Sequence, residues 1–160
     1  MNDTERCSLR PLAESDFAEA AALFTDENVR KYLGGTITEA AAREKLAKWL
    51  TDGESIYFTV RLLADGSFVG IVDVSPHHDR ENKELSYQFL PQHWGMGLAA
   101  EVLENVLEYC RDELGIRKVV SETQTANVRS CRLLEKLGYT LVEQFERYGA
   151  RQNLYVKELT

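Results

Sequence analysis

The stretch Phe89–Glu101, FLPQHWGMGLAAE, decides the fold, because a strand gives way there to a helix through a bend that contains two glycines. We expect the strand to end at Leu90 and a loop to follow over 91–95, after which Gly95-Met96-Gly97 leads directly into a long helix. Free N–H groups at a helix start carry partial positive charge, and glycine lets the backbone approach an anion closely. The stretch therefore predicts a pyrophosphate site. A plain turn is the alternative, since short glycine motifs often occur without a ligand.

Two other phosphate-binding loops compete with this interpretation. The segment 95–100, GMGLAA, formally matches the dinucleotide signature G-x-G-x-x-A, but that signature needs its first glycine at the end of the strand. Here 91–94 intervene, and the remaining chain is too short for a second nucleotide-binding half. A Walker loop would need Lys followed by Ser or Thr after the glycines, and neither follows. Both alternatives are weak, including the nicotinamide-dependent oxidoreductase that the first implies.

Beyond the bend the apolar pattern changes to that of helices. One helix face is expected to carry Leu98, Val102, Leu103, Val106, Leu107, Cys110 and Leu114, and Gly115 ends that helix. A strand over 117–125 follows, and this strand–helix–strand order implies a parallel pair with a right-handed crossover. A second helix over 127–137 is expected to pack through Val128, Cys131, Leu134 and Leu137.

Before the bend the pattern is that of antiparallel strands. β-Branched and aromatic residues fill 55–63 and 67–74, which the tight-turn pair Asp65-Gly66 separates. Further strands are expected over 8–12, 84–90, 139–148 and 151–159, and helices over 17–24 and after Thr38. The sequence thus predicts a mixed α/β fold of about seven strands, largely antiparallel with a central parallel pair, and four to five helices.

Length and composition indicate one globular domain over 1–160. Apolar residues make up 44% of the chain, but the apolar runs are far shorter than the roughly 20 residues of a membrane span. The N-terminus has no apolar signal region, so we expect a cytoplasmic protein without a membrane partner. The net charge of −7, without a basic stripe, argues against a nucleic-acid partner and weakly favours a cationic ligand.

Cysteine and histidine usage predicts neither disulfides nor a metal. The three cysteines have no C-x-x-C spacing, which leaves small buried hydrophobic side chains as the favoured interpretation. The histidines, at 77, 78 and 93, make no recognisable ligand set. We therefore expect no metal.

Two segments resemble motifs of the GNAT acyltransferases. QHWGMGLAAE, 92–101, looks like their motif A, and TANVRSCRLLEKLGY, 125–139, looks like their motif B. The forms Trp94-Gly95-x-Gly97-x-x-x-Glu101 and Asn127-x-x-Ser130 are similar to the branch that includes the ribosomal-protein N-terminal acetyltransferases. LRPLAESDFAEA, 9–20, and Tyr148-Gly149 also fit that branch, so the resemblance covers nearly the whole chain. It implies a GNAT-like fold, acetyl-CoA as co-substrate and acetyl transfer to an amine.

The resemblance also assigns residues to the coenzyme. It implies that Phe89 and Leu90, where neighbouring strands splay apart, pair their backbone with the pantetheine arm, and that Asn127 hydrogen-bonds this arm. An ordinary helix N-cap is the alternative for Asn127, and the two roles are compatible. Glu101 is interpreted as a first-turn carboxylate that the helix dipole stabilises. The pyrophosphate would be held by backbone amides of Gln92, His93, Trp94, Gly95, Met96, Gly97, Leu98 and Ala99.

The chemistry requires a base, an oxyanion donor and a partner for the departing sulfur. Glu84, on the same strand face as Ser86 and Gln88, matches the glutamate common at this place in the branch, and it would act directly or through a water. A solvated strand residue is the alternative, and Asp73 is the reserve candidate for the base. The oxyanion donor, by resemblance, is the backbone N–H of Phe89 or Leu90.

The sulfur partner departs from the wider family. Many members carry a tyrosine where this chain has Leu134, whereas the branch offers a serine that Ser130 matches. A thiol with a pKa of about 8.5 is already a good leaving group, so Ser130 need only hydrogen-bond the sulfur. A helix-surface serine is the alternative, and Tyr139 and Tyr148 stay open as donors.

The leading hypothesis is an amine N-acetyltransferase that forms a ternary complex of acetyl-CoA and its acceptor. The acceptor is a protein N-terminus or a small amine that enters between the helical N-terminal region and the C-terminal hairpin. A coenzyme-A-binding module without turnover is the main alternative. A homodimer formed through the last strand is compatible with the sequence.

Overall fold

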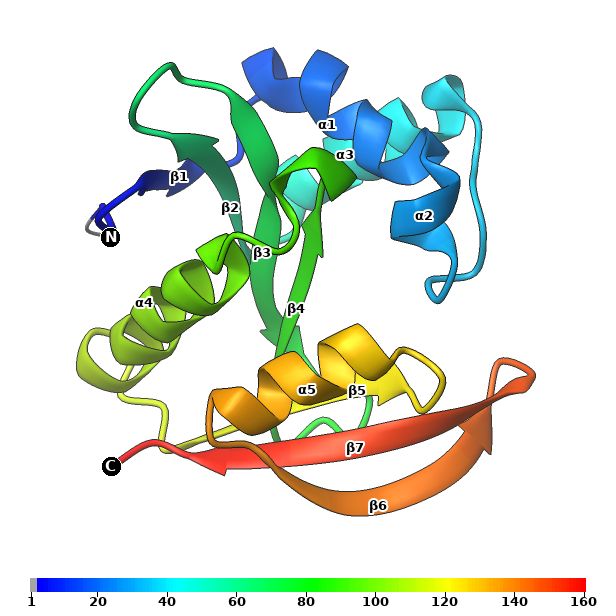
Figure 1. Ribbon diagram of the computed structural model, residues 1–160, viewed down its shortest axis with the longest axis vertical. Helices are drawn as coiled ribbons and strands as arrows, with labels where there is room; N and C mark the ends of the chain where they lie inside the picture. Colours follow the sequence, from blue (N-terminus) through cyan, green and yellow to red (C-terminus); the bar gives the residue numbers. More distant parts are fainter. Residues whose placement is uncertain (1–2) are drawn as a thin grey trace.

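The structure, a computed structural model, describes residues 3–160. Within that range all strands belong to one seven-stranded sheet in the order β1-β2-β3-β4-β5-β7-β6 (Figure 1). The strands are β1 (Cys7–Pro11), β2 (Ile56–Leu62), β3 (Phe68–Pro76), β4 (Lys83–Phe89), β5 (Lys118–Gln124), β6 (Thr140–Arg147) and β7 (Ala150–Glu158). The helices are α1 (Phe17–Thr25), α2 (Glu27–Arg30), α3 (Glu39–Thr51), α4 (Leu98–Asp112) and α5 (Val128–Lys136). The predicted fold class is confirmed.

The sheet opens between β4 and β5, which are its parallel neighbours. They pair at only two positions, Lys83 with Val119 and Glu84 with Val120, and then diverge. Figure 1 shows β2, β3 and β4 running together while β5, β7 and β6 cross below them at a steep angle. Because backbone groups that face the gap have no strand partner there, the gap is the natural place for a ligand to pair with the sheet.

Helices pack on both faces of the sheet. On one face, α4 and α5 cover a core that includes Phe58, Val72 and Leu85. On the other, α1 and α3 cover a smaller core around Phe24 and Ile71. The short helix α2, which the sequence pattern did not predict, begins after Asp26, whose side chain accepts the N–H groups of the first turn at 2.8 and 3.0 Å. No helix within residues 3–160 is long and apolar enough to cross a membrane.

Helix α4 shows why the period of its apolar residues was informative. Val102, Leu103, Val106 and Cys110 are all fully buried against the sheet, as predicted. The expectation for Leu114 was wrong, because the helix already ends at Asp112 and leaves Leu114 38% exposed. All three cysteines are free and buried, in agreement with the sequence.

Candidate active site

The bend before α4 has the backbone conformation that only glycine adopts easily. A short 3₁₀ helix, η2 (Pro91–His93), follows β4, and Gly95 and Gly97 then take φ values of +77° and +76°. A residue with a Cβ pays about 1–2 kcal/mol in this left-handed region. Gly97 is the N-cap of α4 and supplies no side-chain oxygen to the first turn. The N–H groups of that turn are therefore left for an anion, which fits a coenzyme diphosphate.

A cavity of about 520 Å³ lies along the gap between β4 and β5. It is bounded by β4 and β5, by α5 and by the segment from α2 to Leu33. Of the predicted coenzyme residues, Phe89, Trp94, Ala99 and Asn127 line it. The remaining ones belong to the connection between Phe89 and Ala99 and do not line the cavity: Leu90, Gln92, His93, Gly95, Met96, Gly97 and Leu98.

The two backbone amides predicted as oxyanion donors differ in their surroundings. The Leu90 N–H donates to the Val69 carbonyl of β3 at 2.9 Å, and its side chain is buried in the core under α1 and α3. Alternate residues of a strand point their N–H groups to opposite neighbours, so the Phe89 N–H turns away from β3 and towards the gap. The Phe89 carbonyl confirms this direction, because it accepts the Trp94 indole N–H at 2.8 Å. Phe89 is therefore the better candidate.

Asn127 occupies the N-cap of α5. Its Oδ1 accepts the Ser130 N–H at 3.3 Å, so the cap that the sequence left as an alternative is present. Asn127 also lines the cavity, and capping leaves its amide nitrogen available to a ligand. Val128, predicted to be in the core, is 51% exposed and lines the same cavity, because it is the first residue of α5 and faces the gap.

Ser130 has a partner that sequence reasoning missed. Its hydroxyl lies 2.6 Å from the hydroxyl of Tyr87, and both residues line the cavity. Burial raises the pKa of Tyr87 to about 12, although the hydrogen bond with Ser130 lowers it, so the phenol keeps its proton. Alternation along the strand puts Tyr87 on the face opposite Glu84, Ser86 and Gln88, together with the apolar Leu85 and Phe89. The signal that was available is that a tyrosine hydroxyl on an inward face needs a polar partner.

Glu84 is the last residue of β4 that pairs with β5, so it stands at the closed end of the gap. Its Oε2 accepts the Glu122 N–H at 3.3 Å, and its neighbours Leu85 and Ser86 line the cavity although Glu84 itself does not. Burial raises the pKa of Glu84, helped by the nearby Glu122 and opposed by His77. A carboxylate with a raised pKa is a better proton acceptor at neutral pH.

Asp73, the reserve candidate, is paired on β3 opposite Ser86 of β4. Burial raises its pKa to about 7; the Ser75 hydroxyl, 3.0 Å away, lowers it and the Glu84 charge raises it. Two carboxyl groups with raised pKa values thus share the sheet face opposite α4 and α5. Neither residue lines the cavity, but Glu84 pairs with β5 at the end of the gap whereas Asp73 lies one strand further away, on β3, so Glu84 is the nearer of the two to the gap.

Two of the three histidines, His77 and His78, form a cluster with Glu122, which is distant in the sequence. His77, His78 and Glu122 place ligand atoms within 4.8 Å of one another. The guanidinium of Arg147, from β6, lies among them, at 2.8 and 2.6 Å from the ring nitrogens of His78 and at 2.9 and 3.0 Å from the Glu122 oxygens. The cluster therefore connects the loop after β3 to β5 and β6, and the Arg147 guanidinium provides its positive charge.

Comparison with known proteins defines the class of protein first. Residues 6–140 match the family model described as "Acetyltransferase (GNAT) domain", so the chain is an acyltransferase that uses acetyl-CoA. More particularly, it belongs to the GNAT N-acetyltransferase family. The dinucleotide-binding alternative is set aside, because η2 separates β4 from the glycines.

The relatives extend over almost the whole chain. An uncharacterised N-acetyltransferase of Bacillus subtilis, YoaA, is 26% identical over 147 residues, which are 86% of this chain and 81% of that protein. A GNAT-family acetyltransferase from Bacillus anthracis superposes with a TM-score of 0.87 at 22% identity, covering 98% of this chain and 96% of the other. Spermidine N-acetyltransferase from Vibrio cholerae, in complex with CoA and spermine, gives 0.82 at 18%, covering 96% and 95%.

Proposed function

We propose that this N-acetyltransferase transfers the acetyl group directly to a primary amine within a ternary complex, and that it belongs to the branch of the ribosomal-protein N-terminal acetyltransferases. The observation that carries the proposal is the continuity of three features. The glycine bend of α4, which has no side-chain cap, adjoins a cavity along the open β4–β5 gap, and a half-buried carboxylate, Glu84, lies at the closed end of that gap. The Asn127-x-x-Ser130 form supports the branch.

The residues of this chain fit the parts of the coenzyme in order. The first-turn N–H groups of α4 suit the diphosphate, and the inward-facing backbone of Tyr87 and Phe89 suits the amides of the pantetheine arm. Bound acetyl-CoA would supply an activated thioester at the far end of that arm. The Phe89 N–H is then available to hold negative charge on the carbonyl oxygen, a donor whose loss typically costs about 3–4 kcal/mol of barrier.

Proton transfer is assigned to two groups on opposite sides of β4. Glu84 accepts the proton of the incoming ammonium, through a water because its side chain stands behind the cavity lining. The Tyr87–Ser130 hydroxyl pair donates a hydrogen bond to the departing sulfur. Since the pKa of Tyr87 is well above that of a thiol, the pair stabilises the thiolate rather than giving up its proton.

A small cationic amine is the acceptor class that the chain supports best. The net charge of −7 attracts cations, and the segment from Asn28 to Leu33, between the helical region and the gap, supplies part of the cavity wall. Gln124 connects this segment to β5, since its side-chain amide donates to the Tyr32 carbonyl at 3.2 Å. The Vibrio cholerae relative, named for spermidine, has the same fold and gives polyamines a place in any acceptor screen.

The test is a panel of polyamines, aminoglycosides, amino acids and short peptides with free N-termini, each mixed with acetyl-CoA while thiol release is followed. We expect saturable release with at least one cationic small amine. Release with peptides alone would redirect the acceptor to protein N-termini. Thermal stabilisation by CoA without release from any amine would favour the coenzyme-binding module and overturn the proposal.

A further inference from the structure

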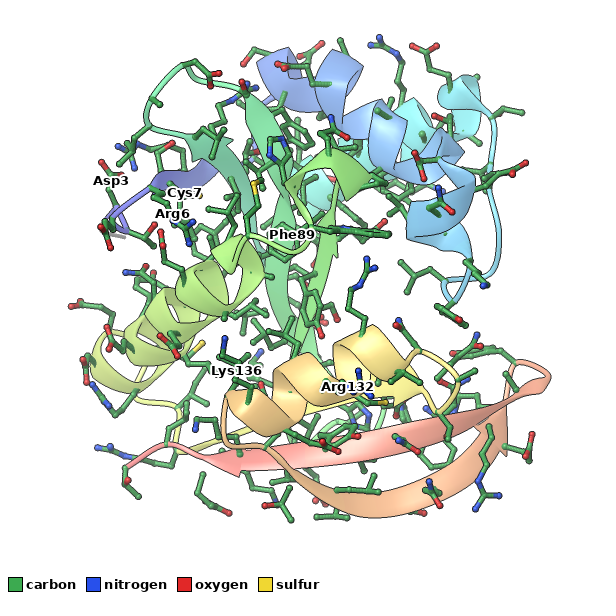
Figure 2. The ribbon with its side chains drawn as sticks, in the orientation of Figure 1. Asp3, Arg6, Cys7, Phe89, Arg132 and Lys136 are labelled. Carbon is green, nitrogen blue, oxygen red and sulfur yellow. The ribbon has the colours of Figure 1, made fainter. Side chains whose placement is uncertain are left out.

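The segment before β1 reaches across to the bend at the start of α4. Arg6 donates from Nη1 to the Met96 carbonyl oxygen at 2.9 Å. Its Nη2 lies 3.5 Å from the place where a Cβ on Gly97 would stand. Figure 2 shows Arg6 beside the N-terminal end of α4, although the two are distant in the sequence. Arg6 therefore contacts the peptide between Met96 and Gly97, which lies within the predicted diphosphate bend.

Arg6 is itself held in place by Glu101, in the first turn of α4. Arg6 Nε donates to Glu101 Oε1 at 2.8 Å, while the Arg6 N–H and the Thr4 hydroxyl donate to Oε2 at 3.0 and 2.5 Å. Burial raises the pKa of Glu101, but these hydrogen bonds outweigh it and lower the pKa overall. Glu101, interpreted from the sequence as a partner of the helix dipole alone, is thus also the anchor of an arginine.

The geometry points to Arg6 as a positioning residue for the coenzyme, acting through the Met96–Gly97 peptide. The C=O and N–H of a trans peptide point in opposite directions, and no described peptide bond is cis. By holding the Met96 carbonyl on its own side, Arg6 directs the Gly97 N–H the other way. Turning this peptide changes ψ of Met96 and φ of Gly97, which is +76°. Because positive and negative φ are about equally accessible to glycine, Gly97 does not by itself hold the peptide in this orientation, and the contact with Arg6 does.

This inference rests on the proposed use of the bend for a diphosphate, and it predicts a loss specific to that group. Arg6→Met removes the donors but keeps most of the apolar stem. We expect the Kd of CoA, measured by calorimetry, to rise about tenfold or more, as for the loss of one charge-assisted hydrogen bond. With S-acetylpantetheine, which lacks the diphosphate, kcat/KM should stay the same as in the wild type, whereas with acetyl-CoA it should fall.

Two further variants separate positioning from general damage. Arg10→Met is the matched control, since Arg10 lies in β1, just after this segment, and pairs with Asp3 at 2.7 Å while no hydrogen bond within residues 3–160 joins it to the bend. Arg6→Lys restores one donor and should recover part of the CoA affinity. Equal losses with both acetyl donors, or an unchanged CoA affinity in a folded Arg6→Met protein, would overturn the inference. Because calorimetry needs no turnover, a wild type that binds CoA but acetylates nothing would contradict the proposed function alone.

Discussion

Replacing Gly97 with alanine tests the diphosphate bend most directly. The residue has a φ of +76°, where an L-residue is strained by about 1–2 kcal/mol. Space does not decide the outcome, because the nearest heavy atom to a new Cβ is Arg6 Nη2 at an ordinary contact distance of 3.5 Å. For a domain of this size the strain corresponds to a fall in melting temperature of roughly 2–8 °C.

The effect on coenzyme affinity should be larger than this strain alone explains. Alanine relieves its strain by rotating towards negative φ, which turns the N–H groups on either side of residue 97 away from a bound diphosphate. Losing one charge-assisted hydrogen bond costs about 1.5–3 kcal/mol, so the Kd of CoA should rise roughly tenfold to a hundredfold. Calorimetric titration with CoA measures this, and thermal unfolding without ligand measures the strain.

The chain supplies a matched control at the other end of the same helix. Gly115 has a φ of +65°, and nothing lies within 4 Å of the place of its Cβ. Gly115→Ala should therefore lose a similar amount of stability while keeping the wild-type CoA affinity. If the two alanine variants, both folded, bind CoA equally well, the assignment of the bend to the diphosphate is wrong.

The other groups of the site lead to three further predictions. Glu84→Gln should slow acetyl transfer strongly with little change in CoA affinity. In the wild type, kcat/KM should rise with pH through a pKa above the usual carboxyl value of about 4.3, and this rise should be absent from the variant. Tyr87→Phe and Ser130→Ala should each lower kcat about tenfold, and the double variant little further, because both act through one hydroxyl pair. Asn127→Ala should cost about 1 kcal/mol of stability together with CoA affinity, whereas Asn127→Ser keeps the cap and loses only affinity.

The sign of the Glu84 effect on stability provides an independent check. When folding raises the pKa of a carboxyl group, as it does for Glu84, the ionised form is less favourable in the folded state than in the unfolded state. The free energy of unfolding therefore falls as the pH rises from the unfolded pKa to the folded one. Glu84→Gln should therefore unfold at the same or a higher temperature than the wild type at neutral pH. A variant that is both slower and less stable at that pH would indicate a structural role instead.

The fold could be predicted because its strongest signals are local. The buried stripe of α4 follows from helical period, and the glycines of the bend follow from the backbone conformation that they alone adopt easily. The parallel pairing of β4 with β5 follows from the single crossover helix between them. Each of these depends on residues that are close in the sequence.

What the sequence did not predict depends on contacts between distant segments. Tyr87 and Ser130 are 43 positions apart, and Arg6 and Glu101 are 95 apart, so no spacing rule joins them. The preference of Phe89 over Leu90 as a donor needs the register of β3, which fixes the direction of every β4 amide. The prediction that Val128 is buried was wrong, because helical period shows which residues share a face but not whether the sheet still covers that face at the end of the helix.

The gap itself explains why these groups gather where they do. Two strands that had stayed paired beyond Glu84 would have satisfied each other's backbone and left no room for a hydroxyl pair. Since they diverge, the inward amides of β4 lack a strand partner, and a pantetheine arm with its own amides is of the right chemistry to act as one. On this argument the polar residues around the gap are arranged for a ligand that completes the sheet, which agrees with a cavity lined by residues of both β4 and β5.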